Sequence, residues 1–183
     1  MNKIKSALII TALLGTLPLM AQEKRVNSTG GTSPHETTSA VVGGNRVTLV
    51  YGRPYTKDPH SGEARKIWGT LVPYGKVWRT GSDEATLLIT QKPIVIGGTT
   101  VPAGAYTLYT LPAEDGSAKL IINKELGQWG THYDESKDLA RVDLKKETLD
   151  KPVDEFTMAV TRNGELKMMW ENTGYSVSFT TQK

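Results

Sequence analysis

Residues 153–172 read VDEFTMAVTRNGELKMMWEN, and this stretch gives the clearest indication of fold class in the chain. Asn163 and Gly164 lie between two runs that are rich in β-forming residues. An Asn-Gly dipeptide accepts the positive φ angles of a two-residue type I′ turn, which joins neighbouring antiparallel strands. The sequence therefore predicts a β-hairpin centred on this dipeptide.

Short apolar runs closed by turn residues precede the hairpin. In residues 46–52 the alternation places Val47, Leu49 and Tyr51 on one face of a half-buried strand. The glycine pair at 43–44 suits the tight turn before that strand. Each such run is too short to be a helix of typical length, so the pattern favours strands.

The same alternation in residues 84–91 predicts that Ala85, Leu87 and Ile89 point inward. Further strands are expected in residues 93–112 (two or three strands, broken by turns), 118–124, 139–147 and 175–182. Helical periodicity is weak: residues 65–71 and 134–139 could each form one turn. No internal repeat of fixed period is present.

These patterns together predict an all-β domain over residues 39–183. We expect a single antiparallel β-sandwich or open barrel of about 8–10 strands with little helix. The spacing of the strands does not decide between a barrel and two sheets.

The N-terminus has the layout of an export signal. Lys3 and Lys5 precede an apolar run, and a small residue follows at Ala21, which is the order found in secretory signal peptides. The apolar run is shorter than the about 20 residues that span a bilayer. We therefore expect a signal peptide at residues 1–21 and, because residues 22–38 are polar and rich in Ser, Thr and Gly, a flexible leader there.

Charge and cysteine content limit the possible partners. The chain has 22 Lys and Arg against 19 Asp and Glu, and removal of residues 1–21 would leave 20 against 19. Without a basic block, a nucleic-acid partner is not predicted. The chain has no Cys, so neither a disulfide nor a lipid-anchor cysteine is expected. We expect a soluble periplasmic or extracellular protein with no transmembrane segment.

The longest irregular region lies within residues 51–88 and concentrates aromatic and arginine side chains: Tyr51, Tyr55, Trp68, Tyr74 and Trp78 with Arg53, Arg65 and Arg79. Such side chains suit a sugar face or a carboxylate, through stacking and paired hydrogen bonds. The alternative is that the aromatic residues belong to the core and close one end of the fold. The candidate ligand-binding residues are Arg53, Trp68, Tyr74, Trp78, Arg79, Glu84 and Trp129.

Arg79 and Glu84 flank a Gly-Ser-Asp corner in VWRTGSDEATLL (77–88). The first interpretation is a partly buried structural ion pair that holds two strands at the corner. The second is a functional pair in which Glu84 acts as base or acceptor and Arg79 binds an anion.

Catalytic and metal motifs are absent from the sequence. His35 lies in the expected leader, whereas His60 and His132 have acidic neighbours but none of the usual metal-ligand spacings. The chain has no Cys nucleophile and no G-x-S-x-G elbow, and no glycine-rich nucleotide loop occurs. We therefore predict no catalytic residue, no metal site and no cofactor.

Three separated motifs carry a resemblance to a known family. RKIWGTLVPYGKVWRTGSDEATLL, PAGAYTLYTLP and QWG occur in order, between about Val41 and about Val160. In these motifs the chain closely resembles a family of secreted bacterial proteins catalogued as domain of unknown function 2911. The resemblance implies an exported β-rich domain without an assigned activity. The family pattern usually has Ala-Asn where this chain has Ser82 and Asp83, and the segment that contains His60 looks like an insertion.

Three functional hypotheses follow from the sequence. The leading one is a non-catalytic exported domain that binds a small molecule, glycan or envelope component. The second is a structural module that binds an envelope partner protein through a sheet edge or the leader. The third is a hydrolase or isomerase that uses Glu84 and Arg79.

Overall fold

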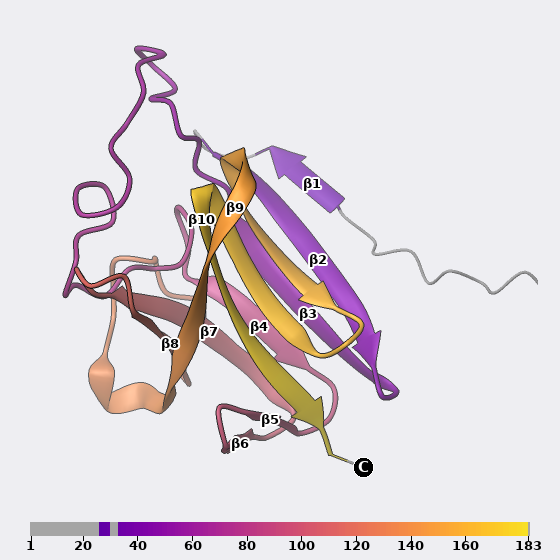
Figure 1. Cartoon of the computed structure of the whole chain (residues 1–183). Coiled ribbons are helices and arrows are strands. Elements are labelled where there is room, and N and C mark those ends of the chain that lie inside the picture. Colours follow the sequence, from indigo (N-terminus) through magenta and orange to yellow (C-terminus); the bar gives the residue numbers. More distant parts are fainter. Residues whose placement is uncertain (1–25, 30–32, 183) are drawn as a thin grey trace, which may run out of the picture.

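The computed structural model describes residues 26–29 and 33–182 (Figure 1). The predicted signal peptide at 1–21 lies outside the described residues. The strands are β1 (Val26–Thr29), β2 (Pro34–Val42), β3 (Asn45–Gly52), β4 (Thr86–Thr90), β5 (Ile94–Ile96), β6 (Thr99–Val101), β7 (Gly104–Pro112), β8 (Ala118–Asn123), β9 (Asp138–Thr161) and β10 (Glu165–Thr181). The one helical element among the described residues is a 3₁₀ turn, η1 (Glu135–Lys137).

The strands form an antiparallel sheet in the order β1-β2-β3-β4-β7-β8-β9-β10-β5-β6. In Figure 1, β9 rises beside β8, twists strongly, and its second half returns in front of β3. There the Phe156 amide donates to the Pro54 carbonyl (2.9 Å) and the Thr56 amide donates to the Asp154 carbonyl (2.7 Å). The fold is thus a curved, open antiparallel sheet, which confirms the predicted all-β class.

The last two strands are longer than expected. Residues 139–147 and 153–161 belong to one strand, β9, and the run 175–182 belongs mostly to β10. Their pairing shifts register on both sides of Glu171, whose φ is 50°. Irregularities of this kind let a pair of strands bend while staying hydrogen-bonded. Because of this bend, two strands that the sequence divides into short runs cover a large part of the core.

Both predicted turns occur, but one has a different length. Val42 pairs with Asn45 across Gly43 and Gly44, which both have positive φ, as a two-residue turn requires. At the second hairpin Thr161 pairs with Glu165, so the loop has three residues and Gly164 alone takes a positive φ (78°). The predicted type I′ turn is therefore wrong there, and a turn that ends in a left-handed glycine replaces it.

Ala85, just before β4, is buried as predicted, but within β4 the inward face is opposite to the prediction. Thr86, Leu88 and Thr90 are buried, whereas Ile89 is 37% exposed. The two threonines satisfy their hydroxyls inside the protein: Thr86 donates to the Thr80 carbonyl (2.7 Å) and Thr90 to the Lys92 carbonyl (2.7 Å). Because threonines occupy the buried face and Ile89 the exposed face, the alternation of apolar residues indicated the wrong face of this strand.

The ordered domain begins before residue 39. Residues 34–38, which we expected in a flexible leader, form the first half of β2, and Glu36 and Thr38 are buried. The sequence of this strand is polar, and its buried residue Glu36 is stabilised by an ion pair with Arg53 (3.0 Å) rather than by apolar contacts. An alternation of apolar residues could not reveal such a strand.

Aromatic side chains form the centre of the core at the end of the sheet from which the 52–76 loop leaves. Trp78 and Trp170 stack with their ring centroids 5.9 Å apart, and Phe156 packs edge-on against both. This arrangement agrees with the interpretation that the loop aromatics close one end of the fold.

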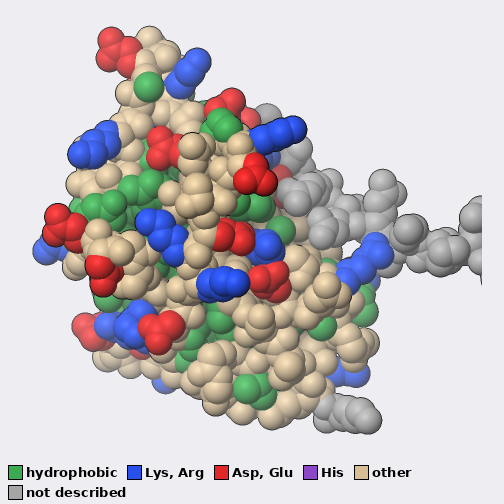
Figure 2. All heavy atoms as spheres, viewed as in Figure 1, with side chains coloured by type: hydrophobic (Ala, Val, Ile, Leu, Met, Phe, Trp, Pro, Cys, Tyr) green, Lys and Arg blue, Asp and Glu red, His purple; other side chains and the backbone are tan. Residues whose placement is uncertain are grey.

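The surface is mixed in charge. Figure 2 shows acidic and basic side chains interspersed over one face of the molecule. Within the part of the chain that the structure describes, no helix has the length and apolarity needed to cross a membrane.

The β4 register gives a direct test. We expect Leu88→Ala to lower the free energy of unfolding by about 2–5 kcal/mol, because it opens a cavity at a fully buried site. The neighbouring Ile89→Ala should cost less than about 1 kcal/mol. Urea unfolding of the two variants makes the comparison, and an equal or reversed order would contradict the observed register.

Candidate functional site

The corner between Trp78 and β4 has an unusual backbone. Thr80 (φ 55°) and Asp83 (φ 64°) both adopt left-handed conformations, which are uncommon for residues other than glycine. Hydrogen bonds fix the corner: the hydroxyls of Thr80 and Thr110 lie 2.8 Å apart, and the Gly130 amide donates to the Asp83 carbonyl (2.9 Å). Backbone strain of this kind clusters at functional sites.

The two side chains that we expected to pair across this corner do not meet. Glu84 is 63% exposed and its carboxylate lies 3.0 Å from Nε2 of His35. Arg79 donates from Nε to the Gly81 carbonyl (3.3 Å), and no ion pair of Arg79 occurs among the described residues. The predicted Arg79–Glu84 pair is therefore wrong, because the two left-handed residues send the side chains to different sides of the corner.

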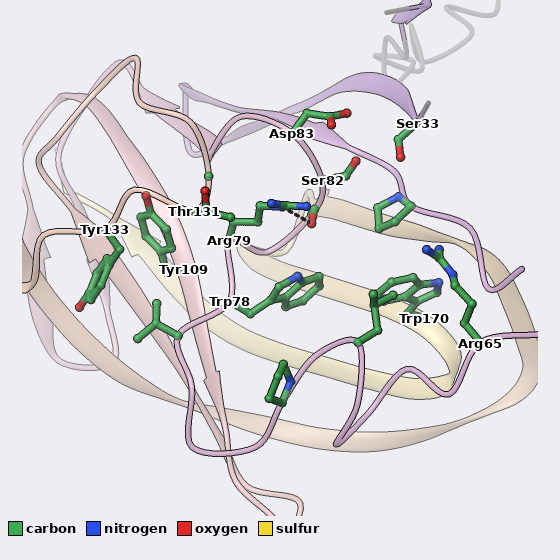
Figure 3. Close-up of a pocket in the computed structure, with 16 residues that line it drawn as sticks. Ser33, Arg65, Trp78, Arg79, Ser82, Asp83, Tyr109, Thr131, Tyr133 and Trp170 are labelled. Carbon is green, nitrogen blue, oxygen red and sulfur yellow. Dashed lines mark hydrogen bonds between the residues drawn. The ribbon is translucent and has the colours of Figure 1, made fainter. Parts of the chain in front are cut away.

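Arg79 instead reaches across a pocket of about 400 Å³. Figure 3 shows it between Thr131 and Ser82, with the rings of Trp78 and Trp170 along one side. Gly130 lies directly against it, since a Cβ there would overlap the Arg79 Cβ (2.8 Å) and the Asp83 carbonyl (2.7 Å). The pocket is lined by Ser33, Pro54, Arg65, Leu71, Pro73, Val77, Trp78, Arg79, Gly81, Ser82, Asp83, Tyr109, Gly130, Thr131, Tyr133 and Trp170.

Four polar atoms of residues that line this pocket are buried and have no hydrogen-bond partner in the structure. They are Nε of Arg65, Oγ of Ser82, Oδ2 of Asp83 and Nε1 of Trp170. A buried polar atom without a partner costs about 1–3 kcal/mol. Two of the atoms are donors, Oδ2 of Asp83 is an acceptor, and the Ser82 hydroxyl can be either.

The imidazole of His35 lies near Asp83 but beyond hydrogen-bond distance of it. His35 Nε2 lies 3.8 Å from Asp83 Oδ2 but only 3.0 Å from Glu84. The His35 side chain therefore engages Glu84 and leaves the Asp83 oxygen without a hydrogen bond. His35, which the sequence placed in a leader, is a residue of β2 whose side chain contacts the corner.

The two tyrosines of the pocket present rings rather than hydroxyls. The Tyr109 hydroxyl donates to the His132 carbonyl (2.9 Å), and the Tyr133 hydroxyl donates to Asp138 (2.7 Å). Burial raises the pKa of both phenols above the ordinary value, and the hydrogen bond to Asp138 raises that of Tyr133 further. Both groups therefore stay neutral at physiological pH.

Arg53, another predicted ligand-binding residue, forms ion pairs and hydrogen bonds with other residues of the protein. Its guanidinium lies 3.0 Å from both Glu36 and Glu155, and it donates to the Phe156 carbonyl (3.2 Å) and to the Thr157 hydroxyl (3.0 Å). These contacts join β2 and the start of the 52–76 loop to β9. Arg53 is a structural residue in this arrangement.

Of the seven predicted residues, Trp78 and Arg79 line the pocket. Trp68 packs in the aromatic core, 6.1 Å from Trp78 between ring centroids. Tyr74 lies on the exposed side of the loop and Trp129 is 53% exposed beside the backbone of Glu84. The structure does not bring these three together with the pocket.

The sequence missed Arg65, Asp83 and Trp170 as pocket residues. Arg65 was noted only as part of an arginine-rich loop, and Trp170 as part of a hairpin. Asp83 stood out because it departs from the family pattern at this position. Only the bend of β10, the fold of the 52–76 loop and the corner at Asp83 place the three residues along one cavity.

The acidic residues near His60 and His132 take part in local turns. Hydrogen bonds from the amides of Ser61 and His60 hold the pKa of Asp58 below its usual value, and Asp134 caps η1 through Ser136. These acids stabilise local turns. Within the described residues no cluster of three or more His, Cys, Asp or Glu could hold a metal ion.

Comparison with known proteins assigns the chain to a family. A family model described as protein of unknown function (DUF2911) matches residues 33–179, so the chain belongs to that family. This confirms the resemblance seen in the three motifs and extends it to the beginning of β2 and the end of β10. Searches of curated proteins and of solved structures found no match.

Variants of Arg53 and Arg79 test which of the two guanidinium groups stabilises the fold. We expect Arg53→Met to lower the free energy of unfolding by about 3–5 kcal/mol, because it removes the positive charge that is paired with the buried Glu36 carboxylate. Arg79→Met should cost about 1 kcal/mol or less, since it removes a single hydrogen bond. Chemical denaturation of both variants measures the difference. A similar loss for both would mean that Arg79 is also structural.

Proposed function

We propose that this protein is a non-catalytic exported domain that binds a small molecule in the pocket beside Arg79. The observation that carries the proposal is the group of unpartnered polar atoms that lie at a concave site with an aromatic wall. Ligand sites combine apolar walls with a few polar groups that fix the ligand. The export part of the proposal rests on the pattern of residues 1–21 alone.

Binding of a small molecule is preferred over the two alternatives for geometric reasons. The enzyme hypothesis required Glu84 and Arg79 at one site, but Glu84 is turned toward His35. A partner-binding module would use a sheet edge or the leader, whereas four residues that carry unpartnered polar atoms line a cavity of about 400 Å³. A cavity of this size suits a ligand no larger than a drug-sized molecule.

The test uses tryptophan fluorescence, because Trp78 and Trp170 both line the pocket. Trp129→Phe removes the exposed tryptophan and so provides a background in which emission reports mainly the core and pocket. We expect at least one member of a panel of monosaccharides, sugar acids, amino acids and aromatic acids to change the emission saturably.

A blocking variant locates the binding. Thr131 is exposed and lines the pocket, so Thr131→Phe should abolish the response without loss of stability. Thr100→Phe, on the exposed side of β6 and outside the pocket, should leave the response unchanged. A response that survives Thr131→Phe, or no response to any panel member, would contradict the proposal.

A further inference from the structure

The charges of the pocket lining are unbalanced. Arg65 and Arg79 supply two positive charges and Asp83 supplies one negative charge, and no other charged side chain lines the cavity. Neither arginine has an ion pair among the described residues: Arg65 donates to the Tyr55 carbonyl and Arg79 to the Gly81 carbonyl. The pocket therefore carries a net charge of about +1, which favours a ligand with a single negative charge.

Arg79 is the group best placed to receive that charge. Its Nε is used by the Gly81 carbonyl, whereas no hydrogen bond of its two terminal nitrogens occurs in the described structure. A guanidinium with both terminal nitrogens available binds a carboxylate through two parallel hydrogen bonds. Figure 3 shows the guanidinium inside the pocket, near Ser82.

The remaining unpartnered atoms require both donors and acceptors on the ligand. Asp83 Oδ2 needs a donor, the Ser82 hydroxyl can accept from one, and Trp170 Nε1 and Arg65 Nε need acceptors. Hydroxyl groups meet both needs, because each can donate and accept. An unsubstituted aromatic or aliphatic acid would leave these four atoms without partners.

The tryptophan side chains of the pocket add an apolar surface for the ligand to contact. The rings of Trp78 and Trp170 stack within 15° of parallel, and Trp170 is only 1% exposed, so the partly buried Trp78 is the tryptophan whose apolar surface a ligand in the cavity can reach. The apolar face of a sugar ring packs on such a surface while its hydroxyls point to the rim.

From these observations we infer that the ligand is a sugar acid, a hydroxylated monocarboxylate whose carboxylate is bound by Arg79 and whose hydroxyls are bound by Asp83, Ser82 and Trp170. This inference rests on the proposed binding function and narrows it. An amino acid is disfavoured because its net charge is zero, and a dianion is disfavoured because Asp83 repels the second charge.

The experiment compares matched ligands in the Trp129→Phe background. Galacturonate and galactose share the same ring and differ in the carboxylate, whereas cyclohexanecarboxylate has the carboxylate without hydroxyls. We expect galacturonate to bind at least about 10-fold more tightly than either comparison ligand, because a charge-assisted pair and the hydroxyl contacts are both needed.

Variants then assign the roles. Arg79→Gln should reduce the preference for galacturonate over galactose to about twofold or less, since it removes the carboxylate contact that only galacturonate makes. Asp83→Asn keeps a residue that tolerates the left-handed backbone. This variant should raise the affinity for galactarate, a dicarboxylate, relative to galacturonate.

The outcomes distinguish the inference from the proposal on which it rests. Equal binding of galactose and galacturonate, or equal loss of both in Arg79→Gln, would overturn the assignment of a sugar acid. The assignment would also be overturned if a panel ligand without a carboxylate bound more tightly than galacturonate and Thr131→Phe blocked its binding. The proposal of small-molecule binding would then still stand. Absence of binding by every panel member would overturn both.

Discussion

The buried ion pair between Arg53 and Glu36 is the contact on which the shape of this open sheet depends. Arg53 also contacts Glu155, the Phe156 carbonyl and Thr157, so one guanidinium joins β2 to the returning half of β9. The Tyr51 hydroxyl adds to this link, because it lies 2.9 Å from Glu36 and accepts from the Met158 amide (2.9 Å). Since the sheet does not close through a continuous strand ladder, these polar contacts hold β9 over the core.

The second arginine of the region, Arg79, has the opposite role. It follows the aromatic core residue Trp78 and is held at a corner whose backbone is strained at Thr80 and Asp83. The hydroxyl pair of Thr80 and Thr110 and the contact with Gly130 stabilise the corner without using the end of the guanidinium. The fold thus fixes the position of Arg79 while its terminal nitrogens make no hydrogen bond in the described structure.

The aromatic core and the proposed ligand site share one wall. Trp170 is 1% exposed, yet its indole nitrogen has no partner and it lines the pocket together with Trp78. The same two side chains therefore pack in the core and line the proposed ligand site, so the two interpretations of the aromatic residues are compatible. Their rigidity in the core would pre-organise the site, which lowers the entropy cost of binding.

The sequence by itself determined the β class, the hairpin positions and the family, because turn residues, alternating apolar residues and short motifs are local features. It also placed Trp78 and Arg79, which both line the pocket, among the candidate binding residues. It could not determine the inward face of β4, where buried threonines replace apolar residues, or the polar first half of β2. The tertiary structure alone decided that Arg53 is neutralised by Glu36, that Glu84 turns to His35, and that Arg65, Asp83 and Trp170 surround Arg79. The physical reason is that these contacts depend on the bend of β9 and β10 and on two left-handed residues, which no local pattern encodes.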